Sequence, residues 1–461
     1  MTSITTEGVT GGRLAAEDYA RNFADLTPPL TRHEAFVEAE RCYFCYDAPC
    51  MQACPTAIDI PLFIRQIAKA NDIGAAETIL SANIMGGMCA RVCPTEQLCE
   101  EACVREHAEG KPVRIGLLQR HATDVLMAAS RATGRHPFGR APDTGRSIAV
   151  VGAGPAGLSC AHRLATLGHT VVLYDARPKL GGLNEYGIAA YKTPGDFAQG
   201  EVDFILGVGG IAVQAGVRLG VDTDLATLRR DHDAVFLGLG LGGFNALPGM
   251  EHYAHVVDAV GYIAMLRQAR SKAEVPVGRR VVVIGGGMTA IDAAVQSRRL
   301  GAEQVTIAYR RGPDDMKASR WEQELAQLSG VTIRHWMSPK GFEGRDGRVA
   351  AVRFEHSAPG GAGPGGAGMP EEVSIPADLV LCAVGQTFLD APLGEGTLAL
   401  DRGRTRVDGE RRTTLPDVWA GGDCVAGGQD LTVSAVEDGK QAALSIDRHV
   451  GADGPMLAGV A

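Results

Sequence analysis

The sequence predicts an α/β fold in which two nested Rossmann-type dinucleotide-binding domains follow an α-helical, cysteine-rich domain. A strand, a glycine-rich loop and a helix follow one another twice, about 130 residues apart, and eight of the eleven cysteines precede the first of these units. With 461 residues, of which 45% are hydrophobic, the chain has material for two or three domain cores. Clustered cysteines ahead of nucleotide loops indicate electron transfer.

The eight N-terminal cysteines form two runs. The first run reads C-x2-C-x4-C-x3-C, and the second reads C-x3-C-x5-C-x3-C. Soft thiolates at such spacings suit iron–sulfur clusters, and in two-cluster ferredoxins the last cysteine of a run commonly binds the other cluster. We therefore expect the two runs to interlock in an iron–sulfur domain. The candidate ligands are Cys42, Cys45, Cys50 and Cys54, followed by Cys89, Cys93, Cys99 and Cys103.

Structural zinc and disulfide bonds are the alternatives for these cysteines. Zinc ribbons usually pair two C-x-x-C knuckles, and only Cys42 and Cys45 form one here. Disulfides are disfavoured because residues Met1 to Phe23 lack a basic-then-apolar secretory signal, and a reducing cytoplasm keeps thiols reduced. We expect a cytoplasmic protein.

The first glycine loop, Gly152 to Gly157, has the spacing G-x-G-x-x-G. The β-rich run Ser147 to Val151 precedes it, a helix from Ala156 to Leu167 follows, and a strand from Thr170 to Tyr174 leads to Asp175. In a Rossmann unit the glycines let the backbone approach a pyrophosphate at the helix N-terminus, and the acid binds a ribose hydroxyl. The complete pattern predicts a dinucleotide site.

The second loop, Gly285 to Ala290, reads G-x-G-x-x-A between a strand, Arg280 to Ile284, and a helix, Ile291 to Leu300. The next strand, Gln304 to Tyr309, ends in cations rather than in an acid. Cations there suit the 2′-phosphate of NADPH, although two nearby aspartates weaken the inference and leave NADH open. The cations are Arg310, Arg311 and Lys317, and the aspartates are Asp314 and Asp315.

Near the C-terminus the strand Val418 to Ala420 runs into Gly421-Gly422-Asp423, and a helix from Val433 to Asp447 follows. In two-dinucleotide flavoproteins such a segment returns to the first nucleotide domain, where the acid can hydrogen-bond the ribityl chain of the flavin. A helix N-terminus there faces the oxygen end of the ring. We expect this segment to close the flavin site.

Composition excludes several classes of protein. A net charge of −9 argues against a nucleic-acid binder, and no apolar run reaches the length needed to cross a bilayer. The glycine-rich stretch from His356 to Glu372 is expected to be a flexible surface loop. The remaining cysteines, Cys160, Cys382 and Cys424, form no C-x-x-C pair, which disfavours a disulfide reductase, and are expected to be buried thiols.

Taken together, these motifs resemble the flavin-containing subunit of bacterial NAD-dependent dihydropyrimidine dehydrogenase. The glutamate synthase small subunit and the N-terminal part of the long eukaryotic dihydropyrimidine dehydrogenase share this plan. The resemblance covers roughly residues 25 to 450. The matching segments read VVGAGPAGLSCA, GGLNEYGI, VVVIGGGMTAIDAA, YRRG and VWAGGDC.

The resemblance implies a ligand set for two [4Fe-4S] clusters. Cys42, Cys45, Cys50 and Cys103 would hold one cluster, and Cys54, Cys93, Cys99 and the side chain of Gln119 would hold the other. Cys89 is then left over. Simple counting leads instead to two all-cysteine clusters that include Cys89, because thiolate is a softer iron donor than amide oxygen. Both possibilities remain open at this point.

The resemblance also assigns FAD to the first loop and NADH or NADPH to the second. It implies domains at residues 1–140 (iron–sulfur), 141–250 and 376–461 (FAD), and 251–375 (nicotinamide nucleotide). The implied FAD residues are Gly152, Gly154, Pro155, Ala156, Gly157, Asp175, Gly182, Leu183, Gly422 and Asp423. The implied nicotinamide nucleotide residues are Gly285, Gly287, Met288, Thr289, Arg310, Arg311 and Lys317.

Electron counting indicates the function. NAD(P)H donates a two-electron hydride, FAD accepts it and releases electrons singly, and each cluster carries one electron. No catalytic triad is needed. The chain ends at Ala461 without room for the FMN barrel of the eukaryotic enzyme, so we expect an FMN-containing partner subunit that interconverts uracil or thymine with dihydropyrimidines. The alternatives are a glutamate synthase small subunit and a non-catalytic redox sensor or scaffold.

Overall fold

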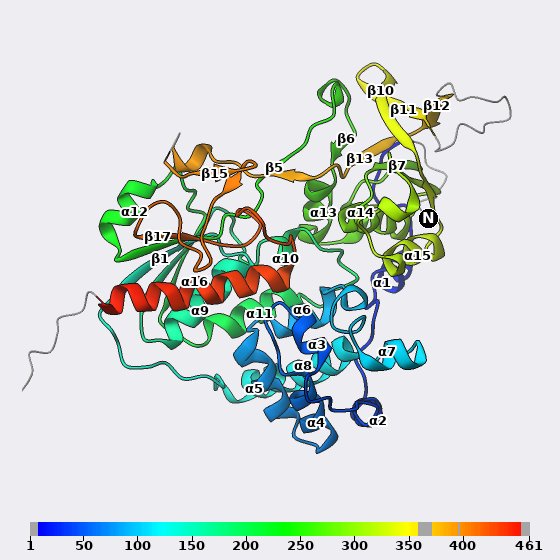
Figure 1. The fold of residues 1–461 in the computed structure, drawn as a ribbon. Helices are drawn as coiled ribbons and strands as arrows, with labels where there is room; N and C mark the ends of the chain where they lie inside the picture. The colour runs from blue at the N-terminus through cyan, green and yellow to red at the C-terminus, as the bar shows by residue number, and fades with distance from the viewer. Residues whose placement is uncertain (1–7, 358–370, 395–396, 453–461) are drawn as a thin grey trace, which may run out of the picture. The chain divides into compact units, whose positions relative to one another are not determined.

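The computed structural model describes residues 8–357, 371–394 and 397–452 (Figure 1). The chain divides into two compact units. Unit 1 comprises Met1–Leu26, Tyr186–Gly195 and Phe244–Gln386, and unit 2 comprises Thr27–Glu185, Asp196–Gly243 and Thr387–Ala461. Within the described residues, no helix has the length and apolar character that a membrane crossing requires.

Short helices with cysteine-bearing loops between them form the first part of unit 2. Local signals set their ends: Thr31 and Glu34 form a capping box at the start of α2, and the Asp59 side chain accepts a hydrogen bond from the Leu62 N–H at the start of α4. The helices are α2 (Arg32–Ala39), α3 (Pro49–Ala53), α4 (Ile60–Ala68), α5 (Asp72–Ala82), α6 (Gly86–Val92), α7 (Val104–Glu109) and α8 (Ile115–Thr133).

The second part of unit 2 is a five-stranded parallel sheet in the order β17-β4-β1-β2-β3. Its middle strands have the order of a Rossmann unit. The strands are β1 (Ser147–Val151), β2 (Thr170–Asp175), β3 (Ile211–Ala215), β4 (Ala234–Leu237) and β17 (Val418–Ala420). The helices are α9 (Pro155–Thr166), α10 (Leu183–Tyr186), α11 (Phe197–Leu206), α12 (Leu225–Asp231) and α16 (Thr432–Ala452).

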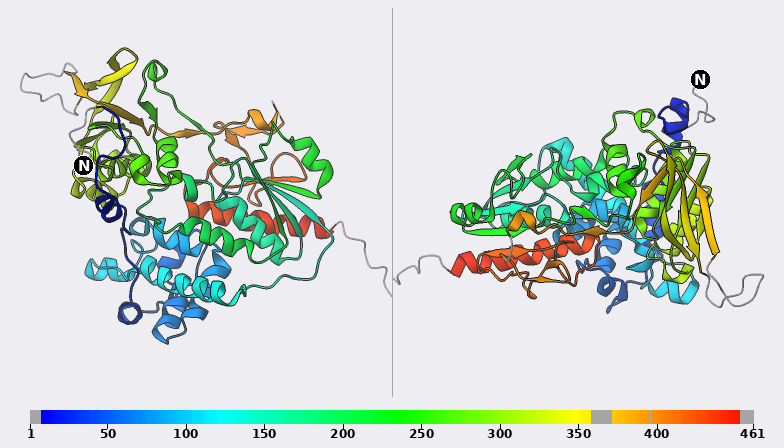
Figure 2. Two further views of the ribbon diagram at one scale, coloured as in Figure 1. Left: turned by 180° about the vertical axis from the view of Figure 1, so that it is seen from behind. Right: turned by 90° about the horizontal axis from the view of Figure 1, so that it is seen from above.

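The last helix joins the C-terminal segment to the first nucleotide loop. In Figures 1 and 2, α16 runs alongside α9, and the Ser159 hydroxyl donates a hydrogen bond to the Val436 carbonyl at 2.7 Å. A Cβ at Gly439 would overlap the carbonyl oxygen of Ala156, so the two helices approach more closely than larger residues would allow. The predicted return of the chain to the first sheet is therefore observed.

Unit 1 has a five-stranded parallel sheet in the order β6-β13-β7-β8-β9 and a three-stranded antiparallel sheet, β10-β11-β12. The parallel strands are β6 (Val256–Asp258), β7 (Arg280–Ile284), β8 (Gln304–Ala308), β9 (Val331–Arg334) and β13 (Leu379–Cys382). The antiparallel strands are β10 (Met337–Arg345), β11 (Arg348–His356) and β12 (Glu371–Pro376). The helices are α1 (Ala16–Asn22), α13 (Ala259–Gln268), α14 (Met288–Arg299) and α15 (Arg320–Leu328).

The remaining strands of the chain are short: β5 (Gly243–Phe244), β14 (Gln386–Thr387), β15 (Leu400–Asp401) and β16 (Arg404–Thr405).

The predicted elements agree with these bounds to within a few residues. The largest difference at a helix start is in α14, predicted from Ile291 and observed from Met288, because helical geometry begins directly after the Gly287 N-cap. Residues 358–370, which make up most of the predicted glycine-rich loop, lie outside the described residues. The predicted α/β fold class is confirmed.

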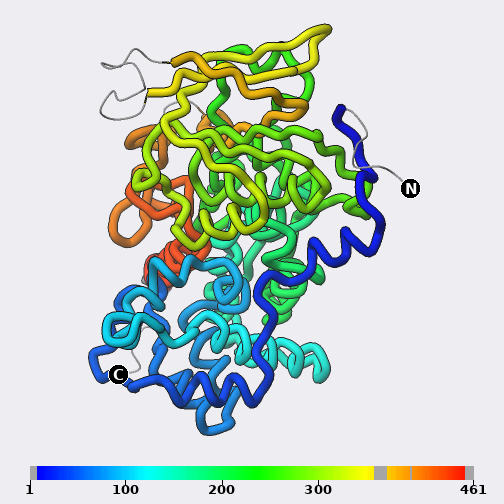
Figure 3. The backbone as a smooth tube through the Cα atoms, turned by 90° about the vertical axis from the view of Figure 1, so that its right-hand side faces the viewer, coloured from blue at the N-terminus to red at the C-terminus, as the bar shows by residue number. Residues whose placement is uncertain are grey.

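The observed units differ from the predicted domain division at the N-terminus. The first residues described, dark blue in Figure 3, run beside the green-to-yellow strands of unit 1. The buried Arg13 guanidinium holds them there, since its Nε donates to the Val277 carbonyl at 2.9 Å. In unit 2 the cysteine-rich helices and the parallel sheet share one compact body.

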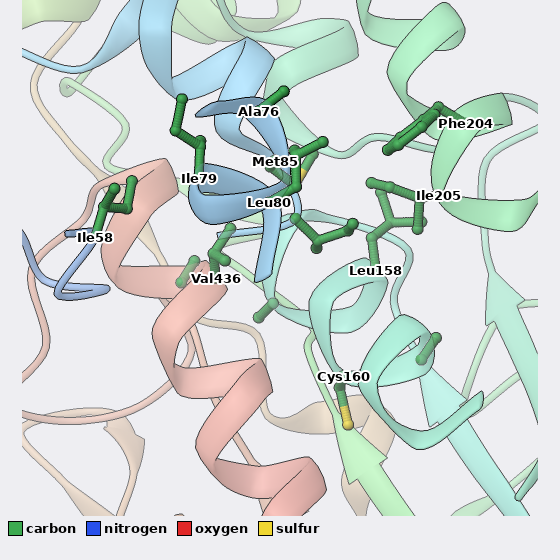
Figure 4. Close-up of a cluster of buried hydrophobic side chains, with 14 of the residues drawn as sticks. Ile58, Ala76, Ile79, Leu80, Met85, Leu158, Cys160, Phe204, Ile205 and Val436 are labelled. Atoms are coloured by element: carbon green, nitrogen blue, oxygen red, sulfur yellow. The ribbon is translucent and has the colours of Figure 1, made fainter. Parts of the chain in front are cut away.

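One hydrophobic core joins the two parts of unit 2. Figure 4 shows Ile79, Leu80 and Met85 from the helical part close to Leu158 of α9 and Ile205 of α11. All five side chains are buried, and each contributes about 1.5–3 kcal/mol through burial. This shared core fixes the position of the cysteine loops relative to the first nucleotide loop.

A buried histidine of unit 2 is expected to make the protein less stable at acidic pH. His162 of α9 packs against His136, with ring centroids 5.5 Å apart, and burial lowers its pKa to about 3. In the unfolded chain this histidine binds a proton below its ordinary pKa of about 6.5, whereas in the folded protein it stays neutral down to about pH 3. The free energy of unfolding therefore falls as the pH drops from about 6.5 towards 3. Between about pH 7.5 and 5.5, the free energy of unfolding of His162→Phe should fall by about 1.4 kcal/mol less than that of the unaltered protein. Denaturant unfolding at the two pH values measures this difference. The exposed His107→Phe is the control, and an equal pH dependence for His162→Phe would contradict the assignment.

Candidate redox centres

Four cysteines from distant parts of the chain line the first cavity. Cys42 and Cys45 come from the segment between α2 and α3, Cys50 lies in α3, and Cys103 directly precedes α7. The rest of the wall is largely apolar and includes Ile60, Ile64, Val113 and Ile115. The structure therefore brings together the four sulfurs that the resemblance groups into one cluster.

The second cavity contains the other predicted donors. Cys54, Cys93, Cys99 and Gln119 line it, and so does Cys89. Five donors thus surround a space in which a cubane needs four, and the lining alone leaves the choice between Gln119 and Cys89 open.

The orientation of Gln119 suits a role as a ligand. This residue of α8 is buried, and its amide nitrogen donates a hydrogen bond to the Gly86 carbonyl at 2.7 Å. The amide oxygen is therefore the atom available to the cavity. Cys89 is held differently, because the buried Asn83 amide nitrogen donates to its sulfur at 3.2 Å. Asn83 has no sequence signature that would have singled it out.

The donor set fits clusters better than single ions. Within the described residues, no three histidine, cysteine, aspartate or glutamate side chains converge on a single-ion site. A cubane holds its four thiolates farther apart than a tetrahedral zinc ion does, because each thiolate binds a different iron. Burial raises the pKa of Cys50 to about 12, so a nearby positive charge is needed to hold that sulfur as a thiolate.

The first nucleotide loop has the shape that a pyrophosphate requires. Gly152 has a φ of +97°, and a Cβ at Gly157 would overlap the carbonyl oxygen of Gly152. The Asp175 carboxylate accepts a hydrogen bond from the Ala153 N–H at 2.7 Å, and burial raises its pKa. Gly154 is the N-cap of α9, and Pro155 and Ala156 form its first turn. These residues fit a dinucleotide whose phosphates meet the helix N-terminus.

Two further segments border this loop. The Gly181 N–H donates to the Ala153 carbonyl at 2.8 Å, and a Cβ at Gly182 would lie 2.7 Å from the Gly154 Cα, ahead of Leu183 at the start of α10. On another side, a Cβ at Gly422 would lie 3.0 Å from the Ala156 Cβ. Burial raises the pKa of the adjacent Asp423 to about 6, so this carboxyl can donate as well as accept hydrogen bonds near that pH.

Sequence reasoning missed the residue that holds this turn. The Asp438 carboxylate of α16 accepts a hydrogen bond from the Gly422 N–H at 2.9 Å and forms an ion pair with Arg411 at 2.6 Å. An aspartate in the middle of a predicted helix carries no local signal of such a role. The contact exists only because α16 folds back beside β17.

The second nucleotide loop, in unit 1, repeats the geometry of the first. Gly285 has a φ of +147°, and a Cβ there would overlap the carbonyl oxygen of Ala383, directly after the neighbouring strand β13. Gly287 is the N-cap of α14, and Met288 and Thr289 begin the helix. Beyond the end of β8, the side chains of Arg310, Arg311 and Lys317 are exposed.

A buried ion-pair network lies behind this loop and was also missed from sequence. The Lys192 ammonium lies 2.8 Å from an Asp292 oxygen of α14 and 2.7 Å from a Glu322 oxygen of α15, and all three side chains are less than 10% exposed. Asp292 also accepts a hydrogen bond from the Ala189 N–H at 3.1 Å. The network fixes the segment Tyr186–Gly195 to the helix that begins at the nucleotide loop.

The two cysteine cavities of unit 2 lie next to each other, and the second borders α16, the helix after Asp423. Val433 of α16 lines the second cavity, and Ile60 lines both cavities. Lys440 of α16 donates hydrogen bonds to the carbonyls of Ala82 at 3.0 Å and Thr56 at 3.4 Å, next to Cys54. The helix α16, which follows the Gly422 turn beside the first glycine loop, thus borders the second cavity, and Ile60 borders both cavities.

The other three cysteines are buried, as predicted. Cys160 and Cys424 are 0% exposed and Cys382 is 5% exposed. All three lie apart from the two cavities described above. They act as small apolar core residues.

Comparison with known proteins agrees with these centres. Residues 19–131 match the family model of the dihydropyrimidine dehydrogenase domain II with a 4Fe-4S cluster, and residues 146–439 match that of pyridine nucleotide-disulphide oxidoreductases. The NAD-dependent dihydropyrimidine dehydrogenase subunit PreT of Salmonella typhimurium is 34% identical, over 93% of this chain and 98% of the relative. The glutamate synthase [NADPH] small chain of Escherichia coli K12 is 32% identical, over 91% and 92%.

Solved structures share the nucleotide-binding fold. The thioredoxin reductase of T. acidophilum superposes with a TM-score of 0.54 at 22% identity, covering 66% of this chain and 99% of that chain. At this identity the similarity establishes the fold alone.

Proposed function

Since this chain belongs to the family of NAD(P)H-dependent flavin and iron–sulfur oxidoreductases that includes PreT and the glutamate synthase small chain, we propose that it is the electron-input subunit of a dihydropyrimidine dehydrogenase. In this proposal FAD binds the first loop, NADH or NADPH binds the second, and two [4Fe-4S] clusters occupy the cysteine cavities. The electrons then pass to an FMN-containing partner that interconverts uracil or thymine with dihydropyrimidines.

The observation that carries this proposal is the order of the centres in unit 2. The helix that follows Asp423 contributes Val433 to the second cavity, and Ile60 lines both that cavity and the first. A flavin, when bound, supplies the change from a hydride pair to single electrons. The residues around it position the nicotinamide and exclude water, and no acid or base needs to be assigned.

Each class of cofactor has its own support. The donors in the two cavities exceed what one cluster needs, since nine candidate ligands line them. The cradle at Gly157 and the cap at Gly154 suit FAD, and the matching features at Gly285 and Gly287 suit the nicotinamide nucleotide.

A reconstituted assay tests the function. The purified chain is mixed anaerobically with NADH or NADPH, uracil and an FMN-containing dihydropyrimidine dehydrogenase subunit, and dihydrouracil is measured. Formation of dihydrouracil that requires both proteins is the expected result. Electron transfer only to a glutamate synthase large subunit would favour the second candidate, which the 32% identity to the glutamate synthase small chain supports. Absence of flavin bleaching by either nucleotide would favour a redox sensor.

The exposed cations after β8 predict a preference between the two nucleotides. If Arg310 and Arg311 bind a 2′-phosphate, their joint replacement by alanine raises KM for NADPH about tenfold or more and leaves KM for NADH nearly unchanged, because a charged hydrogen bond contributes about 1.5–3 kcal/mol. Flavin reduction measured at varied nucleotide concentration checks this. Arg345→Ala, at a 93% exposed arginine of the same unit, is the control. Equal changes for both nucleotides would show that the cations do not read the 2′-phosphate.

A further inference from the structure

A buried glutamate lies behind the second cysteine cavity. Glu201 of α11 is 0% exposed, although glutamate is rarely fully buried without a partner. One carboxyl oxygen accepts a hydrogen bond from the Met88 N–H at 2.8 Å, and the Gly87 N–H also contributes. The other oxygen is buried and has no hydrogen bond among the described residues. Burial raises the pKa of this carboxyl to about 8, so near neutral pH it is largely protonated.

Glu201 acts as the cap of α6. The preceding residue, Met85, supplies no side-chain hydrogen bond to the start of this helix. The Gly86 N–H donates to the Asn83 carbonyl at 2.9 Å, and the next two N–H groups, those of Gly87 and Met88, meet Glu201. A Cβ at Gly87 would lie 2.8 Å from the Glu201 oxygen and 2.7 Å from the Phe197 ring. Glycine at this position therefore lets the carboxyl and the ring reach the helix.

The start of α6 in turn holds the amide of Gln119. The Gly86 carbonyl, one residue before the capped N–H groups, accepts the hydrogen bond from the Gln119 side-chain nitrogen at 2.7 Å. At the other end of the helix, Cys93 is the C-cap, and its N–H donates to the Cys89 carbonyl at 3.0 Å. Two proposed ligands of the second cluster thus depend on the position of this seven-residue helix.

Within α6 itself, the buried side chain of Arg91 links the helix to its surroundings. The Arg91 guanidinium lies 3.5 Å from the centroid of the Phe197 ring and donates to Asp124 at 2.7 Å. It also donates to the Gly87 carbonyl at 3.0 Å. Glu201 is thus the acidic side chain that meets the N–H groups of the helix, while Arg91 meets a carbonyl.

We propose that Glu201 is a positioning residue for the second cluster: by capping α6 it holds Gly86, and through Gly86 it orients the Gln119 amide oxygen towards the iron. The inference rests on the proposed function, in which Gln119 is a ligand. Residues that orient metal ligands through hydrogen bonds commonly change metal affinity or activity by about 10–100-fold when they are replaced.

The test compares three variants in the full chain. We expect Glu201→Ala to change the electron paramagnetic resonance signal of the second cluster and to slow electron delivery to the partner about 10–100-fold, with flavin reduction by the nucleotide unchanged. Glu201→Gln keeps an acceptor oxygen of the same shape, so the signal and the rate are retained. Phe204→Leu, on the same helix but packed on His136 at 4.8 Å, lowers stability without changing the signal.

Other outcomes separate the possible failures. An unchanged cluster signal in Glu201→Ala would overturn the inference, and so would a Glu201→Gln variant as defective as Glu201→Ala, since that would indicate a role for charge. If Glu201→Ala does not fold, Gly87→Ala provides the second test, because its Cβ displaces the helix from the carboxyl, and the same spectral change is expected. A normal second cluster in Gln119→Ala would instead refute the proposed ligand, and with it the premise of the inference.

Discussion

Replacing Lys192 with methionine is expected to lower the free energy of unfolding by about 3–5 kcal/mol. The substitution leaves Asp292 and Glu322 as two buried carboxylates without their shared cation, and breaking a buried pair from one side costs this much because the remaining charge stays desolvated. Denaturant unfolding followed by intrinsic fluorescence measures the change. The proposed nicotinamide nucleotide site should be affected as well, since α14 starts at its loop.

A surface pair in the same unit provides the matched control. Lys340 lies 2.7 Å from Glu355 with a side chain that is 46% exposed, and exposed pairs contribute about 0–1 kcal/mol. Lys340→Met should therefore have little effect. Adding Asp292→Asn and Glu322→Gln to Lys192→Met should recover part of the loss, because no unpaired charge remains. Equal effects of Lys192→Met and Lys340→Met would contradict the role of the network.

Replacing Gln119 with alanine is expected to slow electron delivery to the partner about 100-fold or more. Loss of a residue that only orients a metal ligand commonly costs about 10–100-fold, and loss of the ligand itself should cost at least as much. Flavin reduction by the nucleotide should continue, because the first loop and α16 are untouched. Anaerobic stopped-flow absorbance follows both steps, and an iron assay should fall from about eight irons per chain towards about four.

Cys89→Ala distinguishes the two ligand sets. With Gln119 as the ligand, Cys89→Ala keeps the second cluster and its rate, although the Asn83 hydrogen bond to the sulfur is lost. The reverse result, a normal Gln119→Ala and a cluster-free Cys89→Ala, would establish the all-cysteine set. Cys160→Ala, at a buried cysteine outside both cavities, controls for the loss of a thiol.

The sequence determined the local units of this protein. Strand, glycine loop and helix are encoded by neighbouring residues, so the strands at Ser147–Val151 and Arg280–Ile284 and the helices after them were predictable within a few residues. The cysteine spacing likewise indicated clusters, because thiolate chemistry depends on residue type. The family followed from these motifs, and its two family models cover the same segments.

Only the tertiary structure decided how distant residues meet. Glu201 caps a helix more than 100 residues earlier in the chain, Lys192 is paired by helices 100 and 130 residues later, and Asp438 holds a turn from the middle of α16. No local pattern marks such residues, because a buried charge is tolerated only where folding brings its partner to it. Gln119 is a similar case. In the sequence it is indistinguishable from an ordinary helix residue, and it becomes a candidate ligand only because the fold buries it beside Gly86.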